Sequence, residues 1–464
     1  MGFYLSQTSE IVVIGCGAGG GTAAQFARKT DRKSSITIFE KGKYPQYSKC
    51  GLPYAISGTI PKTSDLVEFS EEWFKNANID LLLETTVEKI DVDNQIVIAK
   101  KGNVVIEKSY TSIIICTGAS PFFPPIQNLE ENGRLVDGVY VVRTIDDAEN
   151  ISSYIKRDGN ATIVGAGLIG LEMADNLHRK GMNITVVEAL PQILLNTLDE
   201  DMAKIVHEAV SEKVAILTNH LATKIETKNG KISQVFIKNN ETGEEQNINT
   251  DLLVVATGTK PEISLAKNIG CKIGRTGGII VNEKSETSVK NIYAAGDCTE
   301  YMDFVTKKPI PIGLGSIAVR QAIAAGINAA GGDYKLPEGV LQTRTSEFFG
   351  LEIAAVGPTI ALLKDMSVVS GKFNGSSLPD YFPGGKSISL KVTVDKKTGR
   401  ILSAQAVGDN AAQRINTFAS AILGGTDVET FRKLETAYAP PIAPTLDAVT
   451  LVCDIVSKKL NLKR

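Results

Sequence analysis

Two glycine-rich turns occupy corresponding places in two copies of one pattern, and this repeat constrains the fold more than any other feature. The turns are Gly15–Gly20 (GCGAGG) and Gly165–Gly170 (GAGLIG). Each follows a continuous apolar run and precedes a helical segment, and a second apolar run then ends in an acid, Glu40 or Glu188. Continuous apolar runs are typical of parallel strands that are covered on both faces. The sequence therefore predicts two βαβ units of the doubly wound kind.

The spacing within each turn predicts a dinucleotide site. The first glycine permits a tight turn, the second lets the backbone approach a pyrophosphate, and the third lets helix and strand pack closely. The helix N-terminus offers amides to the phosphates, and the acid accepts hydrogen bonds from a ribose. One such motif could be a packing turn, but two complete units argue against that interpretation. The residues expected to bind are Gly15, Gly17, Gly20 and Glu40 in the first unit and Gly165, Gly167, Gly170 and Glu188 in the second.

The acid of the second unit also indicates which nucleotide binds there. A carboxylate at Glu188 would repel a 2′-phosphate, and neither arginine nor histidine follows it up to Pro191. The sequence therefore favours NADH, with NADPH as the alternative.

Two further buried strands resemble each other. Ile113–Gly118 and Leu252–Gly258 both end in Thr-Gly and are soon followed by a proline. We expect them to close the two nucleotide domains. The proline-rich stretch Pro121–Pro125 is the expected crossover between them, and another boundary is expected near Gly331–Gly332.

The sequence pattern changes after residue 340. Ser387–Val394 and Ile401–Val407 alternate around a polar turn, which predicts an antiparallel hairpin. A helix is expected over Ala411–Leu423. These segments indicate a mixed α+β domain.

One more helix is expected to start at Thr426, with Glu429 completing a capping box. Val428, Phe431 and Leu434 would line one apolar face of it. Such a face suits an oligomer interface.

Composition excludes several classes of protein. The 464 residues predict about three domains. A net charge of -2 gives no general attraction to nucleic acid or to an anionic membrane, and no apolar run is long enough to span a bilayer. The start, MGFYLSQTSE, lacks the segments of a signal peptide, and no two of the six cysteines have the spacing of a metal site. We expect a cytoplasmic protein with reduced thiols and no metal.

Cys50 stands apart from the other cysteines because of its surroundings. It lies ten residues after Glu40, between Lys49 and Gly51, at the expected start of a helix. A neighbouring lysine and a helix N-terminus favour the reactive thiolate, whereas a structural cysteine is usually buried in an apolar setting. No second cysteine lies within six residues. Cys50 would therefore alternate between thiolate and either a sulfenic acid or a mixed disulfide.

Taken together, these motifs resemble the flavin-dependent pyridine nucleotide-disulfide oxidoreductases over nearly the whole chain. The similarity is closest to their single-cysteine branch, which contains coenzyme A disulfide reductases, NADH oxidases, NADH peroxidases and sulfur reductases. Ile292–Asp297 and Leu314–Ser316 match two later family segments at the flavin. The resemblance implies FAD and NAD(P)H as cofactors and coenzyme A as a further candidate ligand. The implied cofactor-binding residues are Gly15, Gly17, Gly20, Glu40, Lys41, Val87, Thr117, Gly118, Asp297, Ser316, Gly165, Gly167, Gly170, Glu172, Glu188 and Gly258.

The resemblance also implies a domain plan: two Rossmann-like nucleotide-binding domains and a C-terminal α+β dimerisation domain. Residues 1–120 and 265–338 would form the FAD domain, residues 121–264 the NAD(P)H domain and residues 339–464 the dimerisation domain. In the implied homodimer, Tyr438 reaches the Cys50 of the other subunit, and Tyr381 lies in a second tyrosine-bearing segment. Cys50 and Tyr438 are the expected catalytic residues.

Departures from the family pattern narrow the activity. Ala18 stands where the oxidases and peroxidases carry a histidine, so sulfur chemistry is favoured over peroxide chemistry. Lys49 replaces the asparagine usual in coenzyme A disulfide reductases. The expected function is transfer of electrons from NAD(P)H through FAD to Cys50 and on to a small disulfide, with coenzyme A disulfide preferred. The alternatives are an NADH oxidase or peroxidase, a sulfur or polysulfide reductase, and a non-enzymatic redox sensor or electron carrier.

Overall fold

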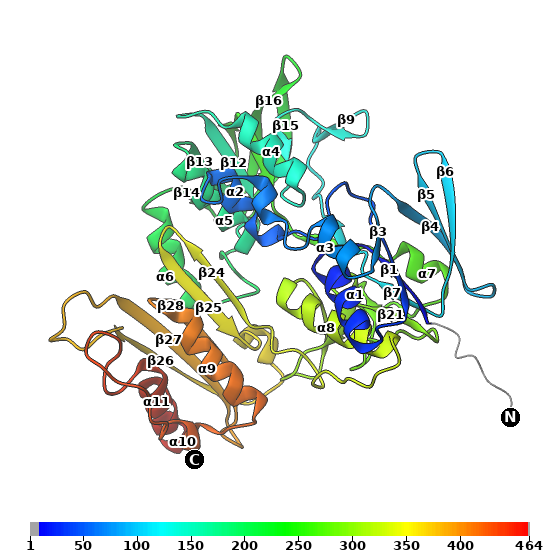
Figure 1. The fold of residues 1–464 in the computed structure, drawn as a ribbon. Helices are drawn as coiled ribbons and strands as arrows, with labels where there is room; N and C mark the ends of the chain where they lie inside the picture. Colours follow the sequence, from blue (N-terminus) through cyan, green and yellow to red (C-terminus); the bar gives the residue numbers. More distant parts are fainter. Residues whose placement is uncertain (1–8, 463–464) are drawn as a thin grey trace, which may run out of the picture. The chain divides into compact units, whose positions relative to one another are not determined.

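The computed structural model of the protein describes residues 9–462 (Figure 1). It contains two units, each built from two stretches of chain: Met1–Phe122 with Thr259–Val340, and Phe123–Gly258 with Leu341–Arg464. The N-terminal segment that is expected to lack a signal peptide lies mostly outside the described residues. Within them, no helix is long and apolar enough to cross a membrane.

The first unit is organised around a parallel sheet with the strand order β21-β7-β1-β2-β3. The predicted order of strand, glycine turn, helix and strand is confirmed. The helix starts at Ala18, because Gly17 is its N-cap residue and the following glycines lie in its first turn. The elements are β1 (Glu10–Ile14), α1 (Ala18–Thr30), β2 (Ser35–Phe39), β3 (Asp80–Leu82), β7 (Ser112–Ile115) and β21 (Ile292–Ala294).

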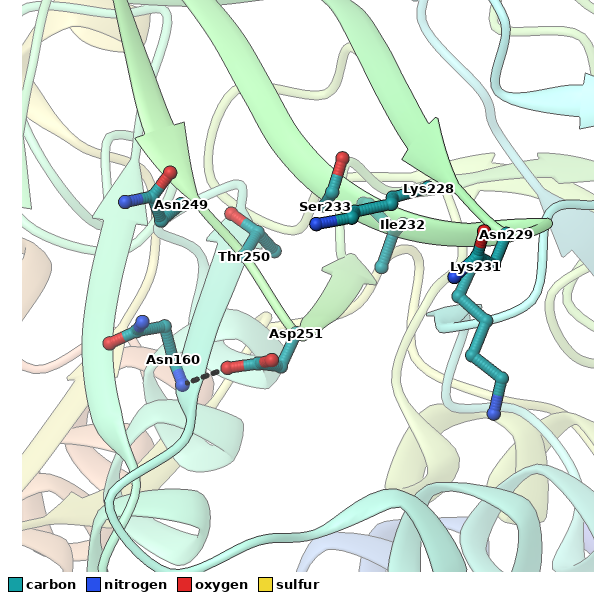
Figure 2. A pocket seen from close by; sticks show the side chains of 9 residues that line it. All are labelled: Asn160, Lys228, Asn229, Lys231, Ile232, Ser233, Asn249, Thr250 and Asp251. Atoms are coloured by element: carbon teal, nitrogen blue, oxygen red, sulfur yellow. Dashed lines mark hydrogen bonds between the residues drawn. The ribbon is translucent and has the colours of Figure 1, made fainter.

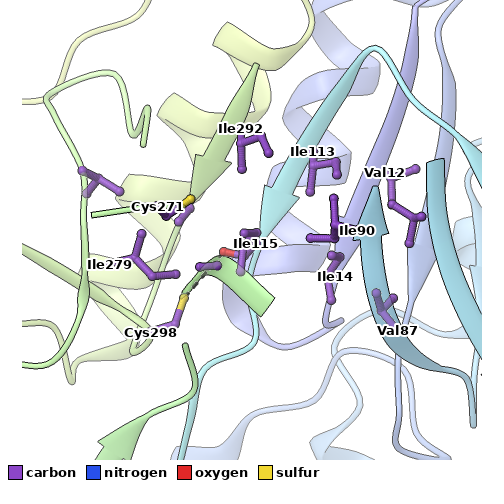
Figure 3. Close-up of a cluster of buried hydrophobic side chains, with 14 of the residues drawn as sticks. Val12, Ile14, Val87, Ile90, Ile113, Ile115, Cys271, Ile279, Ile292 and Cys298 are labelled. Atoms are coloured by element: carbon purple, nitrogen blue, oxygen red, sulfur yellow. Dashed lines mark hydrogen bonds between the residues drawn. The ribbon is translucent and has the colours of Figure 1, made fainter. Parts of the chain in front are cut away.

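Both faces of this sheet are buried, which explains its continuous apolar runs. One face packs against an antiparallel three-stranded sheet, and Ile14, Ile115, Val87 and Ile90 belong to one buried cluster in this layer (Figure 3). The other face packs against α1 and α8, where the backbone of Ala23 leaves no room for a side chain at Gly326. The added elements are β4 (Thr86–Asp91), β5 (Ile96–Lys101), β6 (Val104–Ser109) and α8 (Gly315–Ala329).

The second unit repeats the parallel arrangement with the order β11-β18-β12-β13-β14. The predicted duplication is confirmed, and Gly181, at a φ of 84°, follows the end of its helix. An antiparallel sheet of β15, β16 and β17 packs on one face. The elements are β11 (Val139–Tyr140), α4 (Ile145–Tyr154), β12 (Asn160–Val164), α5 (Leu168–Arg179), β13 (Asn183–Val187), α6 (Glu200–Ser211), β14 (Ala215–Leu217), β15 (His220–Lys228), β16 (Lys231–Asn239), β17 (Glu245–Asn249) and β18 (Leu252–Val255).

The C-terminal part of this unit is an antiparallel sheet with the order β24-β25-β28-β27-β26. The predicted hairpin and the helix over Ala411–Leu423 are confirmed. The predicted fold class, two nucleotide-binding α/β domains with a C-terminal α+β domain, is therefore confirmed. The elements are β24 (Arg344–Phe348), β25 (Leu351–Val356), β26 (Val368–Ser376), β27 (Ser387–Asp395), β28 (Ile401–Gly408), α9 (Ala411–Leu423), α10 (Val428–Phe431) and α11 (Ala448–Leu462).

The predicted start of the helix near Thr426 is wrong by one residue. Asp427 is the N-cap, and its carboxylate accepts a hydrogen bond from the Thr430 amide at 2.9 Å. The expected apolar face is also divided, because Phe431 stacks on Phe418 of α9, with ring centroids 4.9 Å apart, whereas Leu434 lies beyond the helix and is exposed. The apolar face of this helix therefore packs within its own chain.

A buried ion pair ties the last helix to α9. The Arg414 guanidinium donates to both carboxylate oxygens of Asp447, at 3.0 and 2.8 Å, and to the Asp409 carbonyl at 2.8 Å. Removing one partner of a buried pair leaves an uncompensated charge and destabilises by about 3–5 kcal/mol. We therefore expect Arg414→Met to lower the thermal midpoint of the protein clearly, as followed by circular dichroism.

The control is Lys204→Met, because the Lys204–Glu208 pair is exposed at 3.8 Å and contributes little. Equal midpoints for the two variants would contradict the assignment.

Candidate active site

The first glycine turn is tightly packed at its first and last glycines and open at its middle glycine. Gly15 has a φ of 98°, and a Cβ atom there would collide with the Cys116 carbonyl. A Cβ on Gly20 would collide with the Gly15 carbonyl, so both positions require glycine. Gly17, in contrast, has open space within 4 Å of its Cβ position. The backbone of this turn is thus accessible where the N-terminus of α1 begins.

Glu40 lies directly beside this turn. It follows β2, and its two carboxylate oxygens accept hydrogen bonds from the amides of Cys16, at 2.6 Å, and Gly42, at 2.7 Å. The next residue, Lys41, is exposed. The acid therefore lies beside the turn, and its contact with a ribose stays a prediction.

The second turn repeats the backbone conformation and the contacts of the first turn. Gly165 has a φ of 106°, Gly170 abuts the Gly165 carbonyl, and Gly167 faces open space. The Glu188 carboxylate accepts from the Ala166 amide at 2.7 Å and from the Leu190 amide at 3.0 Å. Because the local geometry is the same, the second turn can bind the same kind of ligand as the first.

Other predicted site residues of the first unit gather at the same sheet edge. Thr117 and Gly118 follow β7, and Asp297 follows β21, so the two segments leave adjacent strands of one sheet, in which β7 neighbours the glycine-turn strand β1. Ser316 lies exposed in the first turn of α8, whereas the Val87 side chain is buried in the core. Gly258 occupies the place in the second unit that Gly118 holds in the first, and both have positive φ.

Gln321 was not predicted, yet it supports the Gly296–Asp297 turn. Its fully buried side-chain carbonyl accepts hydrogen bonds from the Gly296 amide at 2.9 Å and from the Thr299 hydroxyl at 3.1 Å. Its Nε2 is buried and has no hydrogen-bond partner among the described residues. A donor is therefore available beneath this turn.

Cys50 is exposed, and the five other cysteines are buried. It lies in the single turn Lys49–Gly51, which α2 (Leu52–Ser57) continues at once. Burial raises the pKa of the Cys298 thiol to about 11 and that of Cys453 to about 12. The pKa values of Cys16, Cys116 and Cys271 are also raised, mainly by burial. Of the six thiols, all within the described residues, only Cys50 is both exposed and flanked by an exposed lysine.

Glu172 lies on α5, shortly after the second glycine turn. Burial raises the pKa of its carboxyl, and a hydrogen bond from the Ser346 hydroxyl, at 2.6 Å, opposes that rise. A half-buried carboxylate thus lies close to the predicted dinucleotide site.

These arrangements agree with a comparison with known families. A family model described as pyridine nucleotide-disulphide oxidoreductase matches residues 9–322. The chain belongs to this family. The dimerisation domain of the same family matches residues 344–449.

Similar proteins cover almost the whole of this oxidoreductase. An NADH oxidase of Methanocaldococcus jannaschii is 38% identical over an alignment of 462 residues that covers 97% of this chain and 99% of the relative. A CoA-dependent NAD(P)H sulfur oxidoreductase of Pyrococcus furiosus is 32% identical over 97% of this chain and 99% of its own length. The structure of an NAD-dependent persulfide reductase from A. fulgidus has a TM-score of 0.92 at 34% identity and covers 97% of this chain and 84% of that chain. The predicted family and enzyme class are confirmed.

Two tyrosines of the dimerisation-domain region form a pair on the surface of this oxidoreductase. The hydroxyls of Tyr381 and Tyr438 lie 2.9 Å apart, although the residues are 57 positions apart in the chain. The hydrogen bond with Tyr438 is the main cause that raises the pKa of Tyr381. Either hydroxyl can be the donor of this hydrogen bond, and the hydroxyl that accepts it keeps its own proton for a third group.

A pocket of about 440 Å³ in the second unit lies away from that unit's glycine turn (Figure 2). It is lined by Asn160 and Asp251, which lie at the amino ends of β12 and β18, and by residues of β15, β16 and β17. The glycine turn leaves the opposite, carboxyl end of β12. None of the predicted site residues lines this pocket, so we do not assign the nucleotide to it.

Among the described residues, no cluster of histidine, cysteine or acidic side chains could hold a metal ion.

Proposed function

We propose that the protein is a flavoprotein that passes electrons from NAD(P)H through FAD to Cys50 and on to a small disulfide, coenzyme A disulfide. The observation that carries the proposal is the one exposed cysteine in a chain with two equivalent dinucleotide turns. The balanced reaction is NAD(P)H + H⁺ + RSSR → NAD(P)⁺ + 2 RSH.

FAD fits the first turn. The open space at Gly17 suits a pyrophosphate at the N-terminus of α1, and Glu40 suits the ribose. Asp297 follows a strand at the same sheet edge, and the buried Nε2 of Gln321 offers a donor beneath that segment. When bound, FAD supplies hydride acceptance and delivery of an electron pair to sulfur. The further residues proposed to line its site are Gly15, Gly20, Lys41, Val87, Thr117, Gly118 and Ser316.

NADH fits the second turn. Gly167 offers the same open backbone, and the Glu188 carboxylate would repel a 2′-phosphate, so NADH is favoured over NADPH. We place Glu172 beside the nicotinamide. Gly165, Gly170 and Gly258 complete the proposed set.

Cys50 receives the electrons as part of a mixed disulfide. No second cysteine lies within six residues of it, so the partner sulfur comes from the substrate. Lys49 and the start of α2 stabilise the thiolate that is restored when the thiol leaves. Coenzyme A as this thiol is supported by the CoA-dependent relative.

The proposed domains are residues 1–120 with 265–338 for FAD, residues 121–264 for NAD(P)H and residues 339–464 for dimerisation. A homodimer with shared active sites is supported by large exposed apolar side chains near the tyrosine pair, at Leu434, Ile442 and Leu446. We propose that the protein acts in the cytoplasm, where its thiols stay reduced.

The tyrosine pair supplies the proton for the leaving thiol. Tyr438→Phe removes that proton donor and should slow disulfide turnover about 10- to 100-fold, as typical for loss of a general acid. Tyr381→Phe should have a smaller effect, because it removes only the supporting hydrogen bond. Both rates are measured with coenzyme A disulfide, and bound flavin is measured by absorbance.

Tyr334→Phe, an exposed tyrosine outside the pair, is the matched control and should leave turnover unchanged. An unaltered rate in Tyr438→Phe would remove this residue from the chemistry.

Sulfur or persulfide reduction is the second candidate, because two of the similar proteins carry these activities in their names. Mass spectrometry of the oxidised protein and turnover with coenzyme A disulfide, polysulfide, oxygen and peroxide separate the candidates. A coenzyme A adduct on Cys50 with fast disulfide turnover supports the main proposal. A single oxygen on Cys50 with fast peroxide or oxygen turnover would replace it with an oxidase or peroxidase.

A further inference from the structure

Glu172 and Ser346 are joined across 174 positions of sequence. The Ser346 hydroxyl donates to the Glu172 carboxylate at 2.6 Å. Ser346 lies on β24 and is buried, whereas Thr345 and Glu347 on the same strand are exposed. The alternation of the strand thus directs Ser346 toward α5.

Two further contacts hold β24 against α5 and the segment before α6. The ring of His178, near the end of α5, lies 5.5 Å from the ring of Phe349, directly after β24. Arg344, at the start of β24, donates to the Asn196 carbonyl in the segment before α6. The Glu172–Ser346 hydrogen bond is therefore one of several contacts that hold β24 against this part of the unit. These contacts keep the two residues within hydrogen-bond distance of each other.

The other charged groups on α5 and β24 either have different partners or are exposed. On α5, Asp175 pairs with Arg179 at 2.9 Å. On β24, Arg344 donates to carbonyl oxygens and Glu347 is exposed. Strands β12 and β13, which also pack against α5, carry no titratable residue. Burial raises the pKa of Glu172, and the interaction that opposes it comes from Ser346.

We propose that Ser346 is a positioning residue that holds the Glu172 carboxylate toward the nicotinamide, so that strand β24 of the dimerisation region forms part of the NAD(P)H site. The inference rests on the proposed function. Loss of hydride leaves positive charge on the nicotinamide ring, which a fixed carboxylate stabilises and a neutral acid does not. A strand of the C-terminal region therefore affects the reductive half-reaction.

The test is the pH dependence of flavin reduction by NADH, measured by stopped flow on the holoenzyme. The carboxylate is present above its pKa, so the rate should fall as the pH falls. Ser346→Ala removes the hydrogen bond that favours the carboxylate, and the falling limb should move to higher pH by roughly one unit. Ser346→Thr keeps a hydroxyl and should restore the wild-type profile.

Two further variants separate positioning from a structural effect. Thr345→Val removes an exposed hydroxyl that donates to the Ile353 carbonyl at 2.8 Å on the same strand, and it should leave the profile unchanged. Glu172→Gln should abolish the fall of the reduction rate at low pH. Adding Ser346→Ala to this variant should change the profile no further, because Ser346 acts through Glu172. Calorimetric titration with NAD⁺ should show the same shift of pH dependence without turnover.

An unmoved limb in Ser346→Ala, or an equal further loss when it is added to Glu172→Gln, would overturn the inference. Failure of NADH to reduce the flavin of the wild-type protein at any pH would instead overturn the proposed function.

Discussion

Cys50→Ser is expected to lose disulfide reduction by at least about 1,000-fold, as typical for removal of a catalytic nucleophile. A hydroxyl cannot form the mixed disulfide, and no other exposed cysteine can replace it, since the remaining five are buried with raised pKa values. The variant should still bind FAD and accept hydride from NADH, because the two glycine turns are unchanged. Steady-state turnover with coenzyme A disulfide and stopped-flow reduction of the flavin measure the two halves separately.

Cys271→Ala is the control for loss of a thiol. Cys271 is buried, and its sulfur lies 3.5 Å from the Thr287 hydroxyl within the core of the same unit. Turnover should be unaltered in this variant. Full disulfide turnover in Cys50→Ser would remove Cys50 from the mechanism.

The second large effect is expected at the middle glycines of the two turns. A methyl group on Gly17 meets no protein atom within 4 Å, so Gly17→Ala should fold, but it occupies the space proposed for the pyrophosphate. Displacing two hydrogen bonds to a charged phosphate, each contributing about 1.5–3 kcal/mol, should weaken FAD binding at least about 100-fold. The purified variant should lack flavin absorbance.

Gly167→Ala is the reciprocal variant, because its Cβ position is equally open. It should retain FAD and lose NADH affinity by a similar factor, measured by titration of the holoenzyme. Each variant is thus the other's control. Loss of FAD from Gly167→Ala with retention in Gly17→Ala would reverse the assignment of the two turns.

The sequence predicted the glycine turns well because their requirements are local. The collisions that a side chain would cause at Gly15 and Gly20 involve the turn and the neighbouring strand, and short-range spacing reports them. The position of Glu40 beside the turn was predictable for the same reason, because this residue follows the strand next to the turn.

What the sequence missed depends on distant contacts. Ser346 meets Glu172 across 174 positions, and Gln321 meets Gly296 across 25, and neither serine nor glutamine has a spacing that indicates such a role. The cap at Asp427 was placed at Thr426 because both residue types cap helices, and only the backbone conformation distinguishes them.

The most direct test of the central claim is an anaerobic titration of the oxidised holoenzyme with NADH, with released thiol counted. Electron relay through Cys50 predicts uptake of about two equivalents of NADH per subunit, one for FAD and one for the Cys50 disulfide, and release of about one thiol. In Cys50→Ser the uptake should fall to about one equivalent with no thiol released. Release of the same thiol from Cys50→Ser, or full reduction of the wild-type protein by one equivalent without any thiol, would contradict the account.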